Sequence, residues 1–481
     1  MSLLRIPERP ASKVVHLLIF PVSMKHVFTV LLGLSTICAF GQQPVPTPSA
    51  SPAPPVGALP NAGSLPIVDG SNGRCLPSPL ASLPFPSAEW DGAPIVGLSA
   101  EAPNYPLQKA LGLSKSRVKV YGWASIGGNL STSHDSNSPT SYNLVPNQVV
   151  LDQFILRVER QPNTVQTDHA DWGFLVDQVY GTDFRYTIAK GIFSDQLLQK
   201  NHLYGYDPTQ FYGLLYLPRI AQGMLLKVGR FISPADIEAQ WAPDNYLYSH
   251  SLMFTVDPYT FMGAQATIRL SPYWQIELGV HGGNDVAVWS NSAHLNGLAM
   301  FRYVSRSNNN SIYAGVNSIG SGQFSHEHDN LQMLVATWGH RFSPKVHTQT
   351  EAYYIWQYDA LVGGTVIGGP ARRFYLNTGP GDPTPGRSEA VGAVNYFEVA
   401  FSKKDYLSVR NDLLVDPQGN RTGFATAYSS HTIGLVHHFS DLIRLRPELR
   451  FERAYAAGIT PYDNGLKRQQ FTAAMDVLIR F

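Results

Sequence analysis

The chain has 481 residues, a formal net charge of +1 at pH 7 and only 15% charged residues, against roughly 25% in ordinary soluble proteins. So small a net charge excludes the strongly basic surface of a nucleic-acid-binding protein, and we expect no nucleic-acid partner. Aromatic residues make up 11% of the chain, which suits a lipid-facing wall with aromatic girdles but also occurs in large soluble β-proteins.

The N-terminal segment, residues 1–41, has the pattern of a secretory signal peptide. A short cationic stretch begins at Met24, residues 27–40 are apolar, and small residues surround the expected cleavage site. A translation start at Met24 stays open as an alternative, because residues 1–23 precede this pattern and have no clear role. A membrane anchor is the other alternative, but the apolar run is shorter than the ~20 residues of a spanning helix.

The next segment, residues 42–116, is rich in Pro, Ser and Gly. Its first part, 44–60, is a proline-rich run of the kind that stays extended and semi-rigid. We therefore predict a disordered periplasmic linker or a small plug, with one weak helix near residues 105–111. The chain contains two cysteines, Cys38 and Cys75. Because Cys38 lies in the predicted signal peptide, a disulfide framework is excluded.

From residue 117 to residue 481 the sequence changes to segments of alternating polarity separated by turn residues. Within residues 274–281, for example, the even-numbered side chains are apolar and the odd-numbered ones are polar or glycine. Successive side chains of a strand point to opposite faces, so this pattern requires one apolar and one polar wall. Since no other segment is long and apolar enough for a spanning helix, a membrane protein of this kind must be a β-barrel.

Loop lengths support an all-β, transmembrane antiparallel barrel of about 16 strands, within a range of about 14 to 18. Most connections after odd-numbered strands are long and most after even-numbered strands are tight, an asymmetry for which a soluble sandwich gives no reason. The connection at 161–170 is a longer exception. The candidate strands are 117–130, 147–160, 171–181, 210–218, 223–232, 260–270, 273–283, 296–306, 310–319, 329–342, 345–358, 392–402, 405–415, 430–440, 442–453 and 469–481.

The last candidate strand ends at Phe481 and has apolar residues at alternate positions before it. This pattern is typical of the C-terminal signal that the barrel-assembly machinery reads, and it makes Phe481 the expected assembly signal. We expect the strand to pair with residues 117–130 and close the barrel. An even strand number then places both barrel ends in the periplasm of a diderm bacterium, with the long loops outside the cell.

Five short motifs carry a resemblance to a known family. They are Tyr-Gly-Trp at 121–123, Val-Gly-Arg-Phe at 228–231, Tyr-Ser-His-Ser-Leu-Met-Phe at 248–254, Pro-Tyr-Thr-Phe-Met-Gly at 258–263 and Gly-Val-His-Gly-Gly-Asn at 279–284. With them, residues 117–481 resemble the OmpL-like β-barrel outer-membrane porin family. The run at 259–263 departs from the family's Thr-His-Thr-Gly pattern. The resemblance implies passive porin activity without naming a solute.

The candidate site is the connection 233–259, the third long loop, which in general porins often folds into the lumen. Carboxylates of this loop facing basic wall residues would orient dipolar solutes and set charge preference. Two alternatives stay open: a surface lid with solvated charges, and a structural ion-pair ladder along strand 442–453. The expected pore-lining and constriction residues are Asp236, Glu238, Asp244, Arg269, Glu277, Arg444, Arg446, Glu448, Arg450 and Glu452.

The remaining motifs favour a channel without a cofactor. The cluster at 325–329 contains His and carboxylate residues that can bind a transition metal, but such loop clusters are usually polar turns. No spacing points to a catalytic pair, so we expect neither an enzyme nor a bound metal. The predicted function is passive diffusion of small hydrophilic solutes or ions through the outer membrane. The alternatives are a binding, adhesion or anchor barrel without an open channel, and a soluble secreted β-protein. The expected partners are lipid, solute and the assembly machinery, and oligomerisation stays open.

Overall fold

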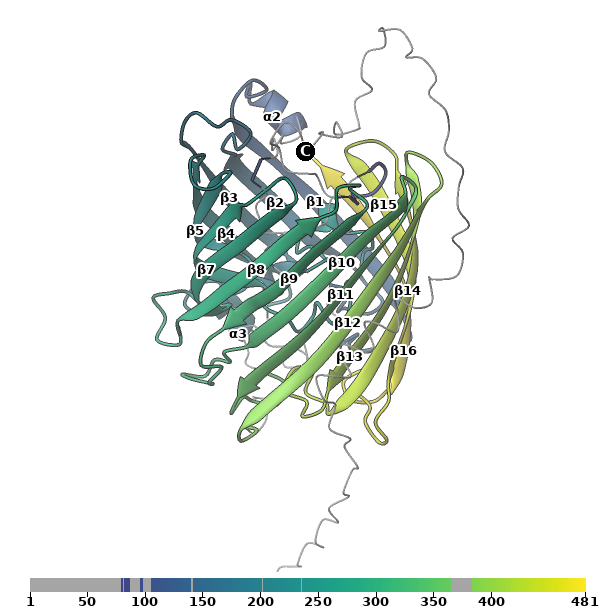
Figure 1. Cartoon of the computed structure of the whole chain (residues 1–481). Coiled ribbons are helices and arrows are strands. Elements are labelled where there is room, and N and C mark those ends of the chain that lie inside the picture. The colour runs from purple at the N-terminus through teal and green to yellow at the C-terminus, as the bar shows by residue number, and fades with distance from the viewer. Residues whose placement is uncertain are drawn as a thin grey trace, which may run out of the picture. The chain divides into compact units, whose positions relative to one another are not determined.

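The computed structural model in Figure 1 describes residues 79–80, 82–86, 96–97, 105–139, 142–200, 202–234, 236–364 and 383–481. The predicted signal peptide, both cysteines and the proline-rich run at 44–60, whose disorder we predicted, lie outside these residues. Within the described part of the chain, no helix is long and apolar enough to cross a membrane.

Sixteen antiparallel strands form one closed barrel, in which each strand pairs with its neighbours in the sequence and β1 pairs with β16. The predicted all-β antiparallel barrel of 16 strands is therefore confirmed. The strands are β1 (Val118–Ser131), β2 (Val149–Arg160), β3 (Asp171–Gly181), β4 (Gly205–Leu217), β5 (Met224–Ile232), β6 (Thr260–Arg269), β7 (Trp274–Asn284), β8 (Asn296–Val304), β9 (Asn310–Ile319), β10 (Gln332–Ser343), β11 (Val346–Tyr358), β12 (Arg387–Ala400), β13 (Asp405–Asp416), β14 (Thr426–His438), β15 (Ile443–Ala454) and β16 (Gln469–Arg480).

Within the residues that the structure describes, four short helical segments accompany the strands. They are α2 (Pro106–Ala110), η3 (Thr182–Tyr186), α3 (Asp195–Gln199) and η4 (Ala242–Asp244). The weak helix predicted near residues 105–111 corresponds to α2. Figure 1 shows α2 and the C-terminus at the same end of the barrel. The tight turns also lie at this end, because β1 starts there and the connections after even-numbered strands return to it. We call it the short-turn end, and the opposite end the long-loop end.

The two faces of β16 illustrate how the sequence builds the wall. Phe471 and Met475 are exposed on the outer face, whereas Thr472 and Asp476 are buried on the inner face. Large apolar side chains exposed on the outside and charged side chains buried on the inside reverse the arrangement of a soluble protein. Such a wall is stable only where lipid covers its outer face.

Three strands begin earlier than predicted, all at the long-loop end. β4 begins at Gly205 rather than residue 210, β12 at Arg387 rather than 392, and β14 at Thr426 rather than 430. The residues of these extensions do not alternate in polarity, but they pair with neighbouring strands that extend equally far. Gly205, for example, pairs with Gly181, the last residue of β3. Pairing therefore fixes these boundaries, and local sequence does not.

Barrel closure explains the Tyr-Gly-Trp motif in β1. Gly122 and Phe481 exchange two backbone hydrogen bonds of 3.0 and 2.9 Å, and the Phe481 ring stacks on Phe154 with centroids 5.4 Å apart. A Cβ atom at Gly122 would lie 2.7 Å from the Phe481 ring and would also clash with the Ile155 carbonyl oxygen. Only glycine therefore fits beside the C-terminal aromatic ring where the barrel closes.

Candidate functional site: the polar inner wall and the β5–β6 loop

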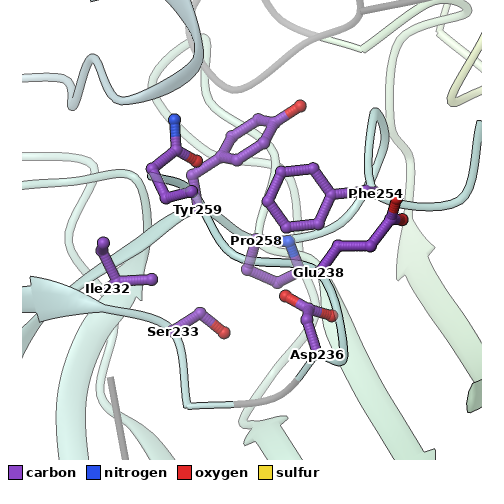
Figure 2. Close-up of a pocket in the computed structure, with 8 residues that line it drawn as sticks. Ile232, Ser233, Asp236, Glu238, Phe254, Pro258 and Tyr259 are labelled. Carbon is purple, nitrogen blue, oxygen red and sulfur yellow. The ribbon is translucent and has the colours of Figure 1, made fainter. Parts of the chain in front are cut away.

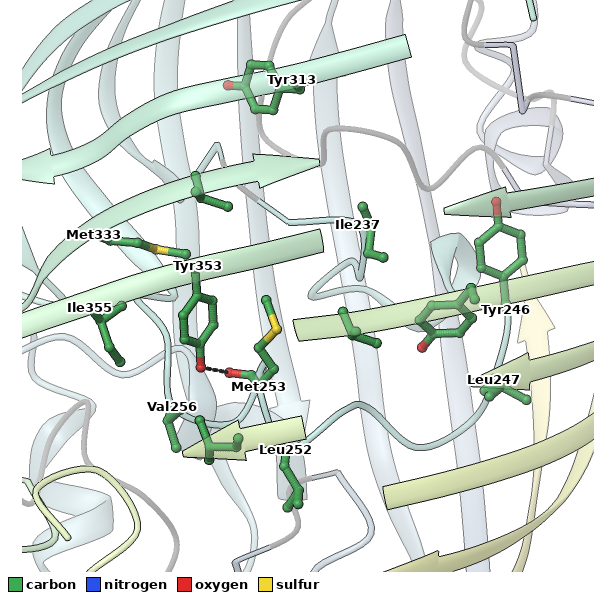
Figure 3. Close-up of a cluster of buried hydrophobic side chains, with 14 of the residues drawn as sticks. Ile237, Tyr246, Leu247, Leu252, Met253, Val256, Tyr313, Met333, Tyr353 and Ile355 are labelled. Atoms are coloured by element: carbon green, nitrogen blue, oxygen red, sulfur yellow. Dashed lines mark hydrogen bonds between the residues drawn. The ribbon is translucent and has the colours of Figure 1, made fainter. Parts of the chain in front are cut away.

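The β5–β6 loop, residues 233–259 with all but residue 235 described, is almost entirely buried. Its apolar side chains pack against apolar residues of the barrel wall. Figure 3 shows loop residue Met253 beside wall residue Tyr353, within a cluster that also contains Tyr246 and Leu252 of the loop and Met333 of the wall. The Tyr353 hydroxyl donates a 2.9 Å hydrogen bond to the Met253 carbonyl oxygen. The loop is therefore packed like a protein core and is not a solvated lid.

Arg446 of β15 binds the first half of the loop. Its guanidinium forms two hydrogen bonds to Asp476 of β16, at 2.8 and 2.6 Å. The Nη1 group also donates to the carbonyl oxygens of Ala242, Asn245 and Leu247, at 2.9, 3.2 and 2.8 Å. Both charged side chains are fully buried. Arg446 thus uses its donors on an ion pair and on three loop carbonyls.

Two further residues of β15 bind the middle of the loop. The backbone N–H groups of Tyr248 and Ser249 each donate a 3.1 Å hydrogen bond to Glu448 Oε2. Arg450 Nη1 donates a 2.6 Å hydrogen bond to the His250 carbonyl oxygen. The polar face of β15 therefore provides an acceptor for the loop's N–H groups and donors for its carbonyl groups, which leaves both kinds of buried backbone group paired.

Glu238 is the carboxylate of the loop that meets a base. It lies 3.3 Å from Arg410 Nη1 of β13 and accepts hydrogen bonds from the Tyr396 hydroxyl at 2.5 Å and the Ser251 N–H at 2.9 Å. Burial would raise the pKa of Glu238, but the charge of Arg410 and, to a lesser extent, His250 hold it below its ordinary value. Glu238 is thus an ionised, fully paired carboxylate that attaches the loop to the wall at β12 and β13.

Asp236 belongs to a second group of carboxyls, with Asp257 at the end of the loop and Glu351 on β11. Glu351 accepts a 2.6 Å hydrogen bond from the Ile237 N–H. Burial first, and then the charges of Asp257 and Glu351, raise the pKa of Asp236 well above its ordinary value. Burial likewise raises the pKa of Asp257 well above the ordinary range. These raised pKa values favour the protonated form of the packed carboxyls.

Beside these carboxyls lies a small pocket that is almost filled by the side chains that line it. Figure 2 shows Asp236 and Glu238 near Phe254, Pro258 and Tyr259 in its lining. The pocket combines two acidic side chains with aromatic and proline rings. Two of the three loop carboxyls predicted for the constriction, Asp236 and Glu238, thus lie at one place in the loop, next to an aromatic surface.

The other predicted residues are distributed around the wall. Arg444 donates a 2.7 Å hydrogen bond to the Ala242 carbonyl oxygen, so it also contacts the loop. Asp244 is half-buried in η4, and burial raises its pKa. Glu452 is paired with Arg450 at 2.7 Å.

Arg269 on β6 and Glu277 on β7 are buried on the inner wall. Glu277 accepts hydrogen bonds from Gln265 at 2.6 Å and Tyr313 at 2.7 Å, both of them wall residues. The structure therefore brings Glu238 together with Arg410 and not with Arg269. Arg410 and Tyr396 were absent from the sequence prediction, although Arg410 lies on the polar face of its alternating strand.

The His and carboxylate cluster at 325–329 does not converge. The His328 ring is buried, with Nε2 at 2.7 Å from the Asn284 carbonyl oxygen, and burial lowers its pKa to about 4. Among the described residues, no group of three or more His, Cys, Asp or Glu side chains is arranged to hold a metal ion.

The family model described as "Putative beta-barrel porin-2, OmpL-like" matches residues 117–481. The chain belongs to the OmpL-like porin family. Its family and fold are those of an outer-membrane channel rather than an enzyme. A comparison of this OmpL-like porin with curated proteins finds no match.

Solved structures similar to the OmpL-like porin include three outer-membrane proteins. The outer-membrane channel DcaP of Acinetobacter baumannii is 9% identical, with a TM-score of 0.44, over 76% of this chain and 97% of that one. The trimer form of OmpT of Vibrio cholerae is 8% identical, with a TM-score of 0.46, over 76% and 99%. OmpF of Salmonella typhi, in complex with daunomycin, is 11% identical, with a TM-score of 0.47, over 76% and 97%.

Proposed function

We propose that this OmpL-like porin is a passive outer-membrane channel for small hydrophilic solutes, narrowed by its β5–β6 loop folded into the lumen. The carrying observation is the path of the loop. The loop joins two strands at the long-loop end, yet Pro243 accepts a 3.4 Å hydrogen bond from Arg480, the last residue of β16, at the short-turn end. A loop that reaches the opposite end of the inner wall must run along the lumen, where it sets the width of any solute path.

In the proposed constriction, some charged residues position the loop and others face a passing solute. Arg446 and Arg450 donate to loop carbonyls, so in our proposal they position the loop. Asp244 is the loop carboxyl that a passing solute would meet, because Glu238 is paired with Arg410 and Asp236 is buried with a raised pKa. We therefore expect a modest preference for cations, since excess carboxylates at a narrow point attract them.

The topology follows from the even strand number. We propose that the short-turn end faces the periplasm, so that both barrel ends are periplasmic and the long loops lie outside the cell. The C-terminal strand ending at Phe481 would act as the assembly signal, after export directed by residues 1–41. These assignments can be checked by protease protection of the long loops in intact and permeabilised cells.

Conductance of the purified chain in planar lipid bilayers tests the function. The expected result is discrete channels with a reversal potential that favours cations, and loss of that preference in Asp244→Asn. Heat-modifiable gel mobility serves as the control for folding. Absence of conductance in the folded complete chain and also in a folded variant without residues 79–104 would refute the channel.

One observation favours the second candidate, a binding or anchor barrel without an open channel. Inner-wall residues such as Glu277, Glu398 and Arg410 are buried, where a wide wet lumen would leave them accessible. A folded barrel that stays closed even after both the loop and the preceding segment are shortened would favour this candidate.

A further inference from the structure

Residues that precede β1 contact the inner wall of the barrel at the short-turn end. We call them the pre-barrel segment and define it as the described residues 79, 80, 82–86, 96, 97 and 105–113. Its contacts fall into three groups, which involve different parts of the barrel circumference.

Phe85 makes the first contact. Its ring is 5% exposed and lies 4.1 Å from the His347 ring of β11 and 5.1 Å from the Tyr406 ring of β13. It also lies 6.4 Å from Tyr246 of the β5–β6 loop, in an edge-on arrangement. Phe85 is therefore inserted between the wall and the loop, where aromatic pairs of this geometry stabilise each other.

Val96 makes the second contact. It is fully buried and packs with Leu214, Tyr216 and Leu225 of β4 and β5. Its backbone N–H donates a 2.9 Å hydrogen bond to Gln275 Oε1 of β7. A spacer in water would have no reason to bury an apolar side chain and pair its N–H with a buried wall amide.

Gln108 of α2 makes the third contact. Its buried side chain accepts a 2.6 Å hydrogen bond from the Val120 N–H and donates a 3.3 Å hydrogen bond to the Val118 carbonyl oxygen. Nearby, the Tyr105 ring lies 5.0 Å from the Tyr121 ring. This contact fixes the end of the segment to the first residues of β1.

The three contacts surround one opening. His347, Tyr406, Gln275 and Leu225 are each the second residue of a strand that starts at the short-turn end, and Val118 is the first residue of β1. The contacts therefore involve β1, β4, β5, β7, β11 and β13, close to the short-turn end of each strand. A chain segment attached at three such points crosses the mouth and leaves little room for a solute to pass.

We propose that the pre-barrel segment is an intramolecular stopper: it occupies the short-turn mouth and the channel conducts freely only when the segment leaves it. The inference rests on the proposed channel function. Because Phe85 also contacts Tyr246, departure of the segment removes packing from the β5–β6 loop, so the two obstructions loosen together.

A deletion and a matched pair of point variants test the stopper in the full mature chain. Deletion of residues 79–104 removes two contacts and keeps α2 and its hydrogen bonds to β1. Phe85→Asp places a charge at the buried contact. Leu83→Asp is the control, because Leu83 lies two residues away in the same segment and is 55% exposed.

Single-channel recording in planar bilayers gives the readout, with heat-modifiable gel mobility as the folding control. We expect the deletion and Phe85→Asp to raise the open fraction by at least about tenfold, the change that about 1.4 kcal/mol of lost docking free energy produces. Leu83→Asp should behave like the wild type. Because Phe85 lies outside the strands, a folding defect of the barrel is not expected in this variant.

The outcomes separate the two proposals. Equal conductance and open fraction in wild type, deletion and Phe85→Asp would overturn the stopper and leave the channel intact. Folded wild type and folded deletion variant that both fail to conduct would overturn the channel function, and the stopper with it. An equal rise in Leu83→Asp and Phe85→Asp would also overturn the stopper, because the effect would then not depend on the buried ring.

Discussion

Replacement of Arg446 by Met tests whether the arginines of β15 hold the β5–β6 loop. The substitution keeps an unbranched apolar stem, although a shorter one, and removes the charge and all the donors of the side chain. Five hydrogen bonds are lost, two to Asp476 and three to the carbonyl oxygens of Ala242, Asn245 and Leu247. The variant therefore breaks a buried ion pair and releases the first half of the loop in one step.

The size of the effect follows from burial. Removing one partner of a buried ion pair costs about 3–5 kcal/mol, because the remaining carboxylate stays desolvated without a counter-charge. Ser125 donates a 2.8 Å hydrogen bond to Asp476 and compensates a part of this loss. Each loop carbonyl left unpaired adds a cost of about 1–3 kcal/mol, unless the loop moves to reach water. Movement of the loop in Arg446→Met therefore costs less free energy than leaving its carbonyl groups buried and unpaired, and we expect the loop to move.

Two measurements distinguish the effect of losing the Arg446–Asp476 ion pair from the effect of losing the hydrogen bonds to the loop. In urea titrations of the folded barrel, Arg446→Met should lose stability, and the double variant Arg446→Met with Asp476→Asn should recover much of it because no uncompensated charge remains. In planar bilayers both variants should show larger current noise and a higher mean conductance than the wild type, since both lack the donors to the loop. Wild-type noise and conductance in the folded double variant would refute the idea that Arg446 positions the loop.

Two further predictions concern barrel closure and pH. Gly122→Ala should destabilise the folded barrel by about 1–3 kcal/mol in urea titrations, because its Cβ would overlap the Phe481 ring. Gly213→Ala on β4 is the control and should be nearly neutral, because its Cβ would meet no atom within 4 Å. Equal effects of the two substitutions would contradict the closure geometry. The raised pKa values of Asp236 and Asp257 mean that the packed loop is most stable below the ordinary carboxyl pKa and loses this stability as the pH rises through the raised values. Current noise should therefore increase toward alkaline pH in the wild type and increase less in Asp236→Asn, and a pH-independent wild type would contradict this assignment.

The barrel could be predicted from the sequence because two independent signals agree. Alternating polarity identifies the individual strands. The alternation of long and short connections distinguishes the two ends of the barrel. Boundaries at the long-loop end could not be predicted, since β4 and β12 continue for as long as β3 and β11 offer pairing partners. That information lies in the neighbouring strand and not in the residues themselves.

The candidate site could be predicted only in part. The sequence singled out the loop at 233–259 and the charged face of β15, and the structure brings these two together. Arg410 and Tyr396, the partners of Glu238, could not be chosen from many polar wall residues without the path of the loop. The role of Phe85 was hidden for a different reason, since one aromatic residue in a Pro- and Ser-rich stretch carries no periodic signal.

The contacts of β15 also decide how its charges act on solutes. The sequence left two alternatives, an ion-pair ladder within the wall and a charged lining for conduction. Arg446 and Arg450 form ion pairs with Asp476 and Glu452 and in addition donate to carbonyl groups of the loop, and Glu448 accepts from the loop's N–H groups. A charged group whose donors are occupied by backbone carbonyls attracts a passing ion less than a free one, because the carbonyl dipoles partly cancel its field. Substitutions on β15 should therefore change current noise more than reversal potential, whereas substitutions at Asp244 should do the opposite.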